Sequence, residues 1–187
     1  FRAACGLEPK PILVSTSSIA LQTAARDEYL PLLSKLLTED GMIAQPLQAV
    51  IRKGKSHYVC DNRLDRRLNQ LDLQKKNWTS GTALLSLRKQ IDMDEATRLS
   101  GYDRERVCVP RICDCQLETC RYLSFIENCE AGYYLFQICN HNLLLADAIH
   151  RSSGRRPILP DACALIIDEA HKLPETARQM FGVTLVA

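Results

Sequence analysis

Two adjacent carboxylates, Asp168 and Glu169, directly follow the apolar run 164–167 and open the sequence Asp-Glu-Ala-His. An apolar run of this length predicts a buried strand, and open α/β sheets bind ligands beyond the carboxyl ends of their strands. Asp168 could hold Mg²⁺ on the phosphates of a nucleotide, and Glu169 could orient and polarise the attacking water. His171 would link the nucleotide to a neighbouring element. The alternative is a helix start whose dipole favours acidic residues.

A nucleotide site also requires a phosphate-binding loop between a strand and a helix. The nearest match is residues 49–56, AVIRKGKS, which begins with Ala and is followed by a poor helix start. We reject this match, and we expect no phosphate loop in this sequence. Its basic residues Arg52, Lys53 and Lys55 fit contacts with a nucleic-acid backbone better.

Four of the nine cysteines fall within residues 108–120, CVPRICDCQLETC. Disulfides are rare in cytosolic proteins, and an odd number of cysteines fits poorly with complete pairing. Clustered thiols in such a protein favour a metal or a metal cluster. Cys60 also lies outside this stretch and is considered below. The other four cysteines are interpreted as small core residues: Cys5, Cys129, Cys139 and Cys163.

The composition is that of a soluble globular protein: 187 residues, 46% hydrophobic and 25% charged, with a formal charge of +2. This length accommodates one domain, or one domain with an insertion. Neither a signal peptide nor a membrane-spanning run is recognisable, so we expect a cytoplasmic protein without a membrane partner.

The hydrophobic pattern predicts strand–helix units at both ends of the sequence. The segment between them, 60–106, is polar, amphipathic and helix-forming, without a convincing strand. This layout predicts an α/β core interrupted by an insertion. The predicted strands are 12–14, 47–51 and 164–167. One predicted helix begins at Ile19, and two others cover 27–38 and 175–181.

Several stretches in this order resemble a known family. ILVSTSSIALQ (12–22) resembles helicase motif Ia, and LIIDEAH (165–171) resembles a Walker B or DEAH motif II. KGKSHYVC (53–60), the cysteine cluster and ICNHNLLLAD (138–147) lie between them. This order is similar to that of the DinG/XPD-like superfamily 2 DNA helicases, which carry an iron–sulfur cluster. The DinG branch is closer, because of the long gap after Cys60 and the Asn-His pair.

The resemblance covers nearly the whole chain and implies part of a RecA-like parallel-sheet motor domain interrupted by a mostly helical iron–sulfur insertion. It implies motor segments at 1–57 and 131–187 and a cluster domain at 58–130. In the family, motif I lies upstream of such a segment, and an arch domain and a second motor domain follow it. This chain alone is therefore expected to be an inactive fragment.

The resemblance also assigns the cysteines that would bind a [4Fe-4S] cluster: Cys60, Cys108, Cys113 and Cys120. Cys115 is surplus to the family pattern, and it could replace Cys113 or Cys120. Structural Zn²⁺ also accepts four thiolates and remains an alternative, although Cys60 lies far from the other cysteines in sequence. The cluster would act as a structural staple.

Contacts with DNA are expected near the first strand. Ser15 and Thr16 suit phosphate oxygens, together with the amides of the following helix. The alternative is that Ser17 or Ser18 simply caps this helix. Arg52, Lys53 and Lys55 would line the path of the strand.

Two further pairs have open roles. Tyr58 and Tyr122 could stack on bases or could pack near the cluster. Asn140 and His141 match a short motif of the family, which implies a coupling role, whereas a lone His is more often structural.

The function implied is that of an ATP-dependent 5′–3′ DNA helicase that unwinds duplex DNA or R-loops. Its cofactors would be a [4Fe-4S] cluster, ATP and Mg²⁺, and its partners single-stranded, fork or R-loop DNA. One alternative is a metal-stabilised nucleic-acid-binding module without enzymatic activity. Another is a redox sensor, which Asp114 disfavours because an acidic neighbour raises the pKa of the Cys115 thiol.

Overall fold

The computed structural model describes residues 10–73, 79–113, 115 and 120–182. The chain divides into two compact units. The sheet unit comprises Phe1–Arg52 and Asn128–Ala187, and the insert unit comprises Lys53–Glu127. The division falls a few residues before each expected boundary, so Lys53 and Lys55 belong to the insert unit.

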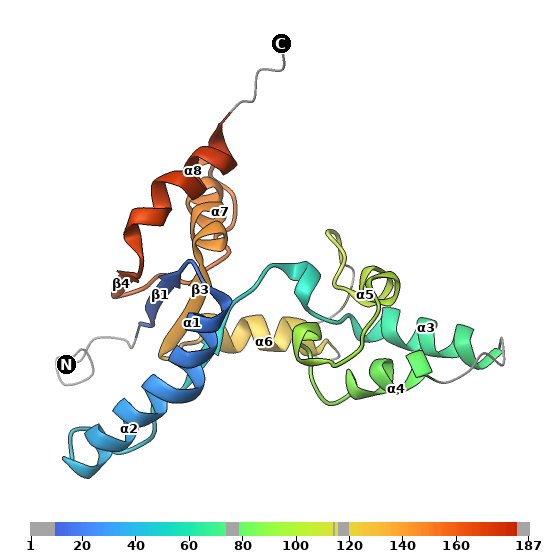
Figure 1. Cartoon of the computed structure of the whole chain (residues 1–187), viewed down its shortest axis with the longest axis horizontal. Helices are drawn as coiled ribbons and strands as arrows, with labels where there is room; N and C mark the ends of the chain where they lie inside the picture. Colours follow the sequence, from blue (N-terminus) through green and yellow to red (C-terminus); the bar gives the residue numbers. More distant parts are fainter. Residues whose placement is uncertain (1–9, 74–78, 114, 116–119, 183–187) are drawn as a thin grey trace. The chain divides into compact units, whose positions relative to one another are not determined.

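The sheet unit is built on four parallel strands in the order β2-β3-β1-β4 (Figure 1). The parallel sheet confirms the predicted α/β class. β3 is not among the strands predicted from the sequence. The strand bounds are Ile12–Thr16 for β1, Ala49–Ile51 for β2, Phe136–Asn140 for β3 and Ala164–Ile167 for β4.

The first two helices of the sheet unit run on from one another through a π-helical turn at Ala25–Tyr29 (Figure 1). α7 begins directly after β3, and α8 begins with Pro174 in its first turn, where a missing N–H costs nothing. The helix bounds are Ile19–Ala24 for α1, Leu30–Glu39 for α2, His141–Ser152 for α7 and Leu173–Phe181 for α8.

The two faces of β3 contribute to two separate apolar cores. Successive strand residues point to opposite faces, and Ile138 and Cys139 are both fully buried. Ile138 packs with Leu30, Ile51 and Phe136, whereas the Cys139 cluster includes Leu13. β3 therefore anchors both faces of the sheet.

The edge strand β4 differs from the other strands in burial. Leu165 and Ile166 are about half exposed, at 49% and 50%. The expectation of a buried strand here is wrong for the described chain, although the strand itself forms as predicted. The apolar sequence follows the usual pattern of parallel strands, which are covered on both faces.

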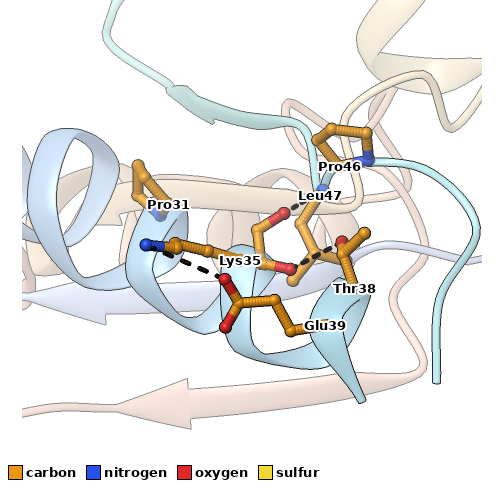
Figure 2. Close-up of a pocket in the computed structure, with 7 residues that line it drawn as sticks. Pro31, Lys35, Thr38, Glu39, Pro46 and Leu47 are labelled. Atoms are coloured by element: carbon orange, nitrogen blue, oxygen red, sulfur yellow. Dashed lines mark hydrogen bonds and ion pairs between the residues drawn. The ribbon is translucent and has the colours of Figure 1, made fainter. Parts of the chain in front are cut away.

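A hollow of about 480 Å³ lies between α2 and the loop before β2, and Figure 2 shows the residues that line it. The Ser34 hydroxyl accepts a hydrogen bond from the Leu47 amide at 2.9 Å, and Lys35 faces Glu39 at 3.8 Å. The Ser34–Leu47 bond holds the loop on the helix, whereas the Lys35–Glu39 pair lies within α2. None of the residues that line the hollow follows the carboxyl end of a strand.

The insert unit is mostly helical, as predicted. Among its described residues, strand pairing is limited to the bridges Tyr58–Asp92 and Val59–Cys108. Its main core includes the fully buried Leu84, Leu87 and Met93. None of the described helices is long and apolar enough to cross a membrane. The helix bounds are Asp61–Leu73 for α3, Thr79–Ser86 for α4 and Gly101–Val107 for α5, and α6 (Arg121–Glu130) begins in this unit.

Asp94 is the centre of an ion-pair network in the insert unit. Its carboxylate lies 2.9 Å from Lys53, 2.8 Å from His57 and 2.6 Å from Arg104. Burial opposes ionisation of Asp94, but these hydrogen bonds outweigh it and hold its pKa well below the ordinary value of 3.8. Asp94 therefore stays charged in the folded protein at pH values where the unfolded chain begins to take up protons.

We expect Asp94→Asn to lower the free energy of unfolding by about 1 kcal/mol at pH 7, because this half-exposed network is partly screened by water. A carboxyl whose folded pKa is depressed stabilises the fold above its unfolded pKa and loses that contribution as the pH falls below it. The difference between the variant and the wild type should therefore shrink below about pH 4. Urea denaturation at several pH values measures this, and a difference that grows with acidity contradicts it.

Candidate functional site

The carboxyl ends of the parallel strands meet at one edge of the sheet, which we call the carboxyl edge. Thr16 of β1 pairs in register with Asn140 of β3, and Ser15 pairs with Ile167 of β4. The residues that follow these three strands therefore come together, although they are far apart in sequence. This edge is where α/β sheets bind ligands.

A buried polar pair lies at the ends of β1 and β3. The Ser15 hydroxyl and the Nδ1 atom of His141 are 2.7 Å apart, and both residues are almost completely buried. Within the described part of the chain, His141 Nε2 and the neighbouring Thr16 hydroxyl have no hydrogen-bond partner. Buried polar atoms are normally paired, so this region holds hydrogen-bonding capacity that the described chain does not use.

Glu169 is held in a defined position at the carboxyl edge. Its carboxylate accepts hydrogen bonds from the Ser17 hydroxyl and, at 2.9 Å, from Lys172. These two bonds, that of Ser17 first, lower the pKa of Glu169 below its ordinary value. Its backbone is left-handed, with φ 47°, which is uncommon for a residue other than glycine. The result is an ionised carboxylate that can accept a hydrogen bond from a water molecule and so orient it.

Asp168 and His171 flank this carboxylate. The Asp168 amide donates to the Ser15 carbonyl at 2.8 Å and so extends the pairing of β4 with β1, while its side chain is exposed. His171 is exposed in the short helical turn Ala170–Lys172. Asp168 is thus free of the sheet core and accessible to a cation, whereas no described contact assigns a role to His171.

Ser17 is a residue that sequence reasoning considered only as a helix cap. Ser18, the other candidate, occupies the cap position of α1, and its side chain makes no capping bond there. Ser17 bonds Glu169 across 152 positions of sequence. The signal available in the sequence was a hydroxyl at the end of the first strand, but its partner depended on the pairing of β1 with β4.

Several residues assigned to DNA are placed differently from the expectation. Ser15 and Thr16 are 0% and 2% exposed, so their hydroxyls do not reach the surface. Arg52 is 3% exposed and donates to the Gln137 side chain at 2.7 Å and to the Ile158 carbonyl at 2.9 Å. The Arg52 side chain is thus held inside the sheet unit, and contact of these three residues with DNA stays a prediction.

The other residues predicted to contact DNA or to couple it to the nucleotide site differ in whether their side chains already have partners. Lys53 is engaged by Asp92 and Asp94, at 2.6 and 2.9 Å, whereas Lys55 is exposed. Asn140 caps α7, because its side chain accepts a bond from the Leu143 amide at 2.8 Å. Of the basic residues chosen for DNA, only Lys55 is both exposed and without an ion pair among the described residues.

The alternation of side chains around Cys60 separates the clustered thiols into two groups. Tyr58 and Cys60 contribute to one core of the insert unit, and Val59 between them contributes to the other. Cys108 pairs with Val59 across an antiparallel bridge, and residues directly opposite each other point to the same face. Cys108 therefore packs with the Val59 core, on the face away from Cys60.

Three other cysteines lie with Cys60. Cys120 belongs to the same core, and Cys115 packs against it. A hydrogen bond with Cys113, burial, and the neighbouring thiols of Cys60 and Cys120 together raise the pKa of Cys115 to about 12. The Cys108 sulfur instead approaches the Glu105 carbonyl, at 3.4 Å.

The geometry of this thiol group bears on the kind of metal centre it could hold. Among the described residues, no three His, Cys, Asp or Glu side chains are close enough together to hold a single metal ion. An iron–sulfur cluster is likewise held by thiolates, and the assignment of these thiols to a cluster stays a prediction.

The other cysteines and aromatic residues have structural surroundings. Tyr58 packs on Tyr122 with ring centroids 5.4 Å apart, and both are buried, which supports packing rather than stacking on bases. Cys129 and Cys139 are buried, as expected for small core residues, but Cys163 is exposed, so that expectation is wrong. Cys5 lies outside the described residues.

The parallel sheet, with two carboxylates directly after its edge strand, is consistent with part of a RecA-like α/β domain. No family model matches the chain. The chain is 30% identical over 192 residues to the ATP-dependent DNA helicase YoaA of Escherichia coli, covering 94% of this chain and 28% of that protein. It is 26% identical to the ATP-dependent DNA helicase DinG of Photobacterium profundum, covering 90% of this chain and 26% of that protein.

A further relative has a different activity in its name. The chain is 26% identical to the 3′-5′ exonuclease DinG of Bacillus subtilis, with 92% of this chain and 18% of that protein covered. These similarities confirm the predicted resemblance: the chain is a homologue of one segment of the DinG-like helicases. It spans only about a quarter, or less, of the length of these relatives.

Proposed function

We propose that this chain is the part of an ATP-dependent DNA helicase that carries the catalytic carboxylates and an iron–sulfur insertion. The observation that supports this most directly is the position of Glu169, which Ser17 and Lys172 hold at the carboxyl edge as an ionised carboxylate. The names of the relatives agree with this activity.

In this proposal Asp168 and Glu169 divide the work on the nucleotide. Asp168, exposed beyond the sheet, holds Mg²⁺ on the phosphates. Glu169 accepts a hydrogen bond from the attacking water and orients it toward the terminal phosphate. The buried Ser15–His141 pair, with its unused Nε2 atom, couples this edge to bound DNA through β1 and β3. Its role is positional, because neither residue reaches the surface.

The insertion would hold a [4Fe-4S] cluster, which supplies a covalent cross-link between distant segments. The family pattern assigns Cys60, Cys108, Cys113 and Cys120, but the side-chain alternation favours Cys115 in place of Cys108. The proposed ligands are therefore Cys60, Cys113, Cys115 and Cys120. The partners would be single-stranded, fork or R-loop DNA, with movement in the 5′–3′ direction.

We expect Glu169→Gln in the full-length helicase to lower kcat for DNA-stimulated ATP hydrolysis by about 100-fold or more, because a group that positions and deprotonates the nucleophile typically contributes this much. Glu175→Gln, which changes an exposed carboxylate of α8, serves as the matched control and should retain wild-type activity. If Glu169→Gln hydrolyses ATP as the wild type does, the proposed catalytic role is wrong. A wild type without ATP hydrolysis would favour the non-enzymatic binding module.

A further inference from the structure

A second candidate site lies on the insert unit. A pocket of about 200 Å³ is lined by four arginines and one glutamine. The lining residues that belong to α3 follow the first of them, Arg63, by three, four and seven positions. This spacing places them on one face of the helix. No acidic residue lines the pocket. The lining residues are Arg63, Arg66, Arg67, Gln70 and Arg106.

The charges of this arginine pocket are only partly compensated. Arg67 donates to the buried carboxylate of Asp103 at 2.7 Å. Arg63 donates to the Cys108 carbonyl at 3.0 Å, which leaves its charge unneutralised. Among the described residues, no ion pair is found for Arg63, Arg66 or Arg106, so the pocket carries an excess of about three positive charges at short range.

An aromatic side chain completes the site. The Arg106 guanidinium lies 3.4 Å from the centroid of the Tyr102 ring, and that of Arg67 lies 5.1 Å from it. Tyr102 is 55% exposed. The ring thus orients two guanidiniums by cation–π contact and still presents apolar surface to solvent.

We propose that the arginine pocket binds phosphates of a single-stranded nucleic acid, with Tyr102 as a contact for an adjacent base. Guanidiniums present paired N–H donors that match phosphate oxygens, and a positive groove beside an aromatic ring is how proteins bind single strands without sequence preference. An acidic peptide would match the charge but would not use the ring. The inference rests on the proposed function, since it assigns DNA contact to the insertion.

The test measures, by fluorescence anisotropy, the binding of a fluorescent oligothymidylate of about 20 nucleotides to the whole chain. The pocket variant is Arg66→Gln with Arg106→Gln. The matched control is Lys89→Gln with Arg98→Gln, which removes the same charge from exposed positions of the insert unit that do not line the pocket. Thermal unfolding checks that both variants fold.

We expect the pocket variant to bind about tenfold more weakly at low salt, and the control to bind within about twofold of the wild type. Between about 50 and 200 mM salt, the slope of log affinity against log salt should fall by about 1.4 in the pocket variant, or 0.7 for each lost phosphate contact. Competition with polyglutamate and with inorganic phosphate separates a nucleic-acid site from a general anion site.

Equal affinity and slope for the pocket variant and the wild type would overturn the arginine pocket and leave the ATP hydrolysis test unaffected. A wild-type chain that does not bind the oligonucleotide would also overturn it. So would polyglutamate that displaces the oligonucleotide at equal charge concentration. If Glu169→Gln hydrolyses ATP as the wild type does while the pocket variant still binds the oligonucleotide more weakly, only the proposed catalysis is rejected. The two failures are therefore distinguishable.

Discussion

Cys115→Ser is expected to remove the iron from this chain, whereas Cys108→Ser is expected to retain it. In the insert unit Cys115 packs with the core that contains Cys60 and Cys120, and Cys108 packs with Val59 on the opposite face. A cysteine that points away from the others cannot ligate the same cluster without a change in the bridge between Val59 and Cys108. The two substitutions are therefore matched in chemistry and differ only in the face that they occupy.

The measurement is iron, sulfide and zinc analysis after anaerobic purification, with the visible absorption spectrum as a second readout. The wild type should contain about four iron atoms per chain, and Cys60→Ser should contain none. Cys163→Ser, at an exposed position of the sheet unit, is the control. Iron lost from Cys108→Ser and kept in Cys115→Ser would restore the family pattern and reject the assignment from geometry. Zinc in place of iron would reject the cluster.

Gln137→Leu is expected to destabilise the chain by about 3 kcal/mol, because it leaves a buried charge without its partner. The Gln137 side chain accepts a bond from Arg52 at 2.7 Å and donates to the Cys129 carbonyl at 2.7 Å, and all of its surface is buried. The Arg52 guanidinium is 3% exposed and has no described carboxylate partner. Its charge therefore depends on neutral oxygen acceptors.

Arg52→Met is the informative companion, because it removes the charge together with its need for partners. We expect it to cost less than Gln137→Leu, and we expect the double variant to be more stable than Gln137→Leu alone. Urea denaturation of the four proteins measures the three differences. If Arg52→Met is stable but loses affinity for the oligothymidylate, the side chain contacts DNA after all, and the structural role assigned here is wrong.

The class of fold and the location of the carboxylates could be predicted from the sequence. The apolar run before Asp168 and the hydroxyl-rich turn after the first strand are local patterns, and the strands at 12–16 and 164–167 form at those places. Helix 175–181 likewise lies within α8. The mostly helical insertion was also predictable, because its amphipathic segments lack any β pattern.

Contacts between distant segments could not be predicted in the same way. Arg52 follows a strand as a basic residue in a basic stretch, which is the pattern of a surface contact. Only the pairing of β2 with β3 places it beside Gln137, in the interior. In the sequence Ser17 resembles a helix cap, but the pairing of β4 with β1 places Glu169 next to it.

The sequence by itself determined which chemistry is available: adjacent carboxylates at the end of a strand, clustered thiols, and basic residues spaced along helices. The tertiary structure alone decided which members of each set come together, because partners 85 to 152 positions apart are joined only through the register of parallel strands. Which thiols come together depends on the alternation of side chains in extended chain, where neighbouring residues face opposite sides. Cys60 and Cys115 therefore share a core from which Cys108 is turned away.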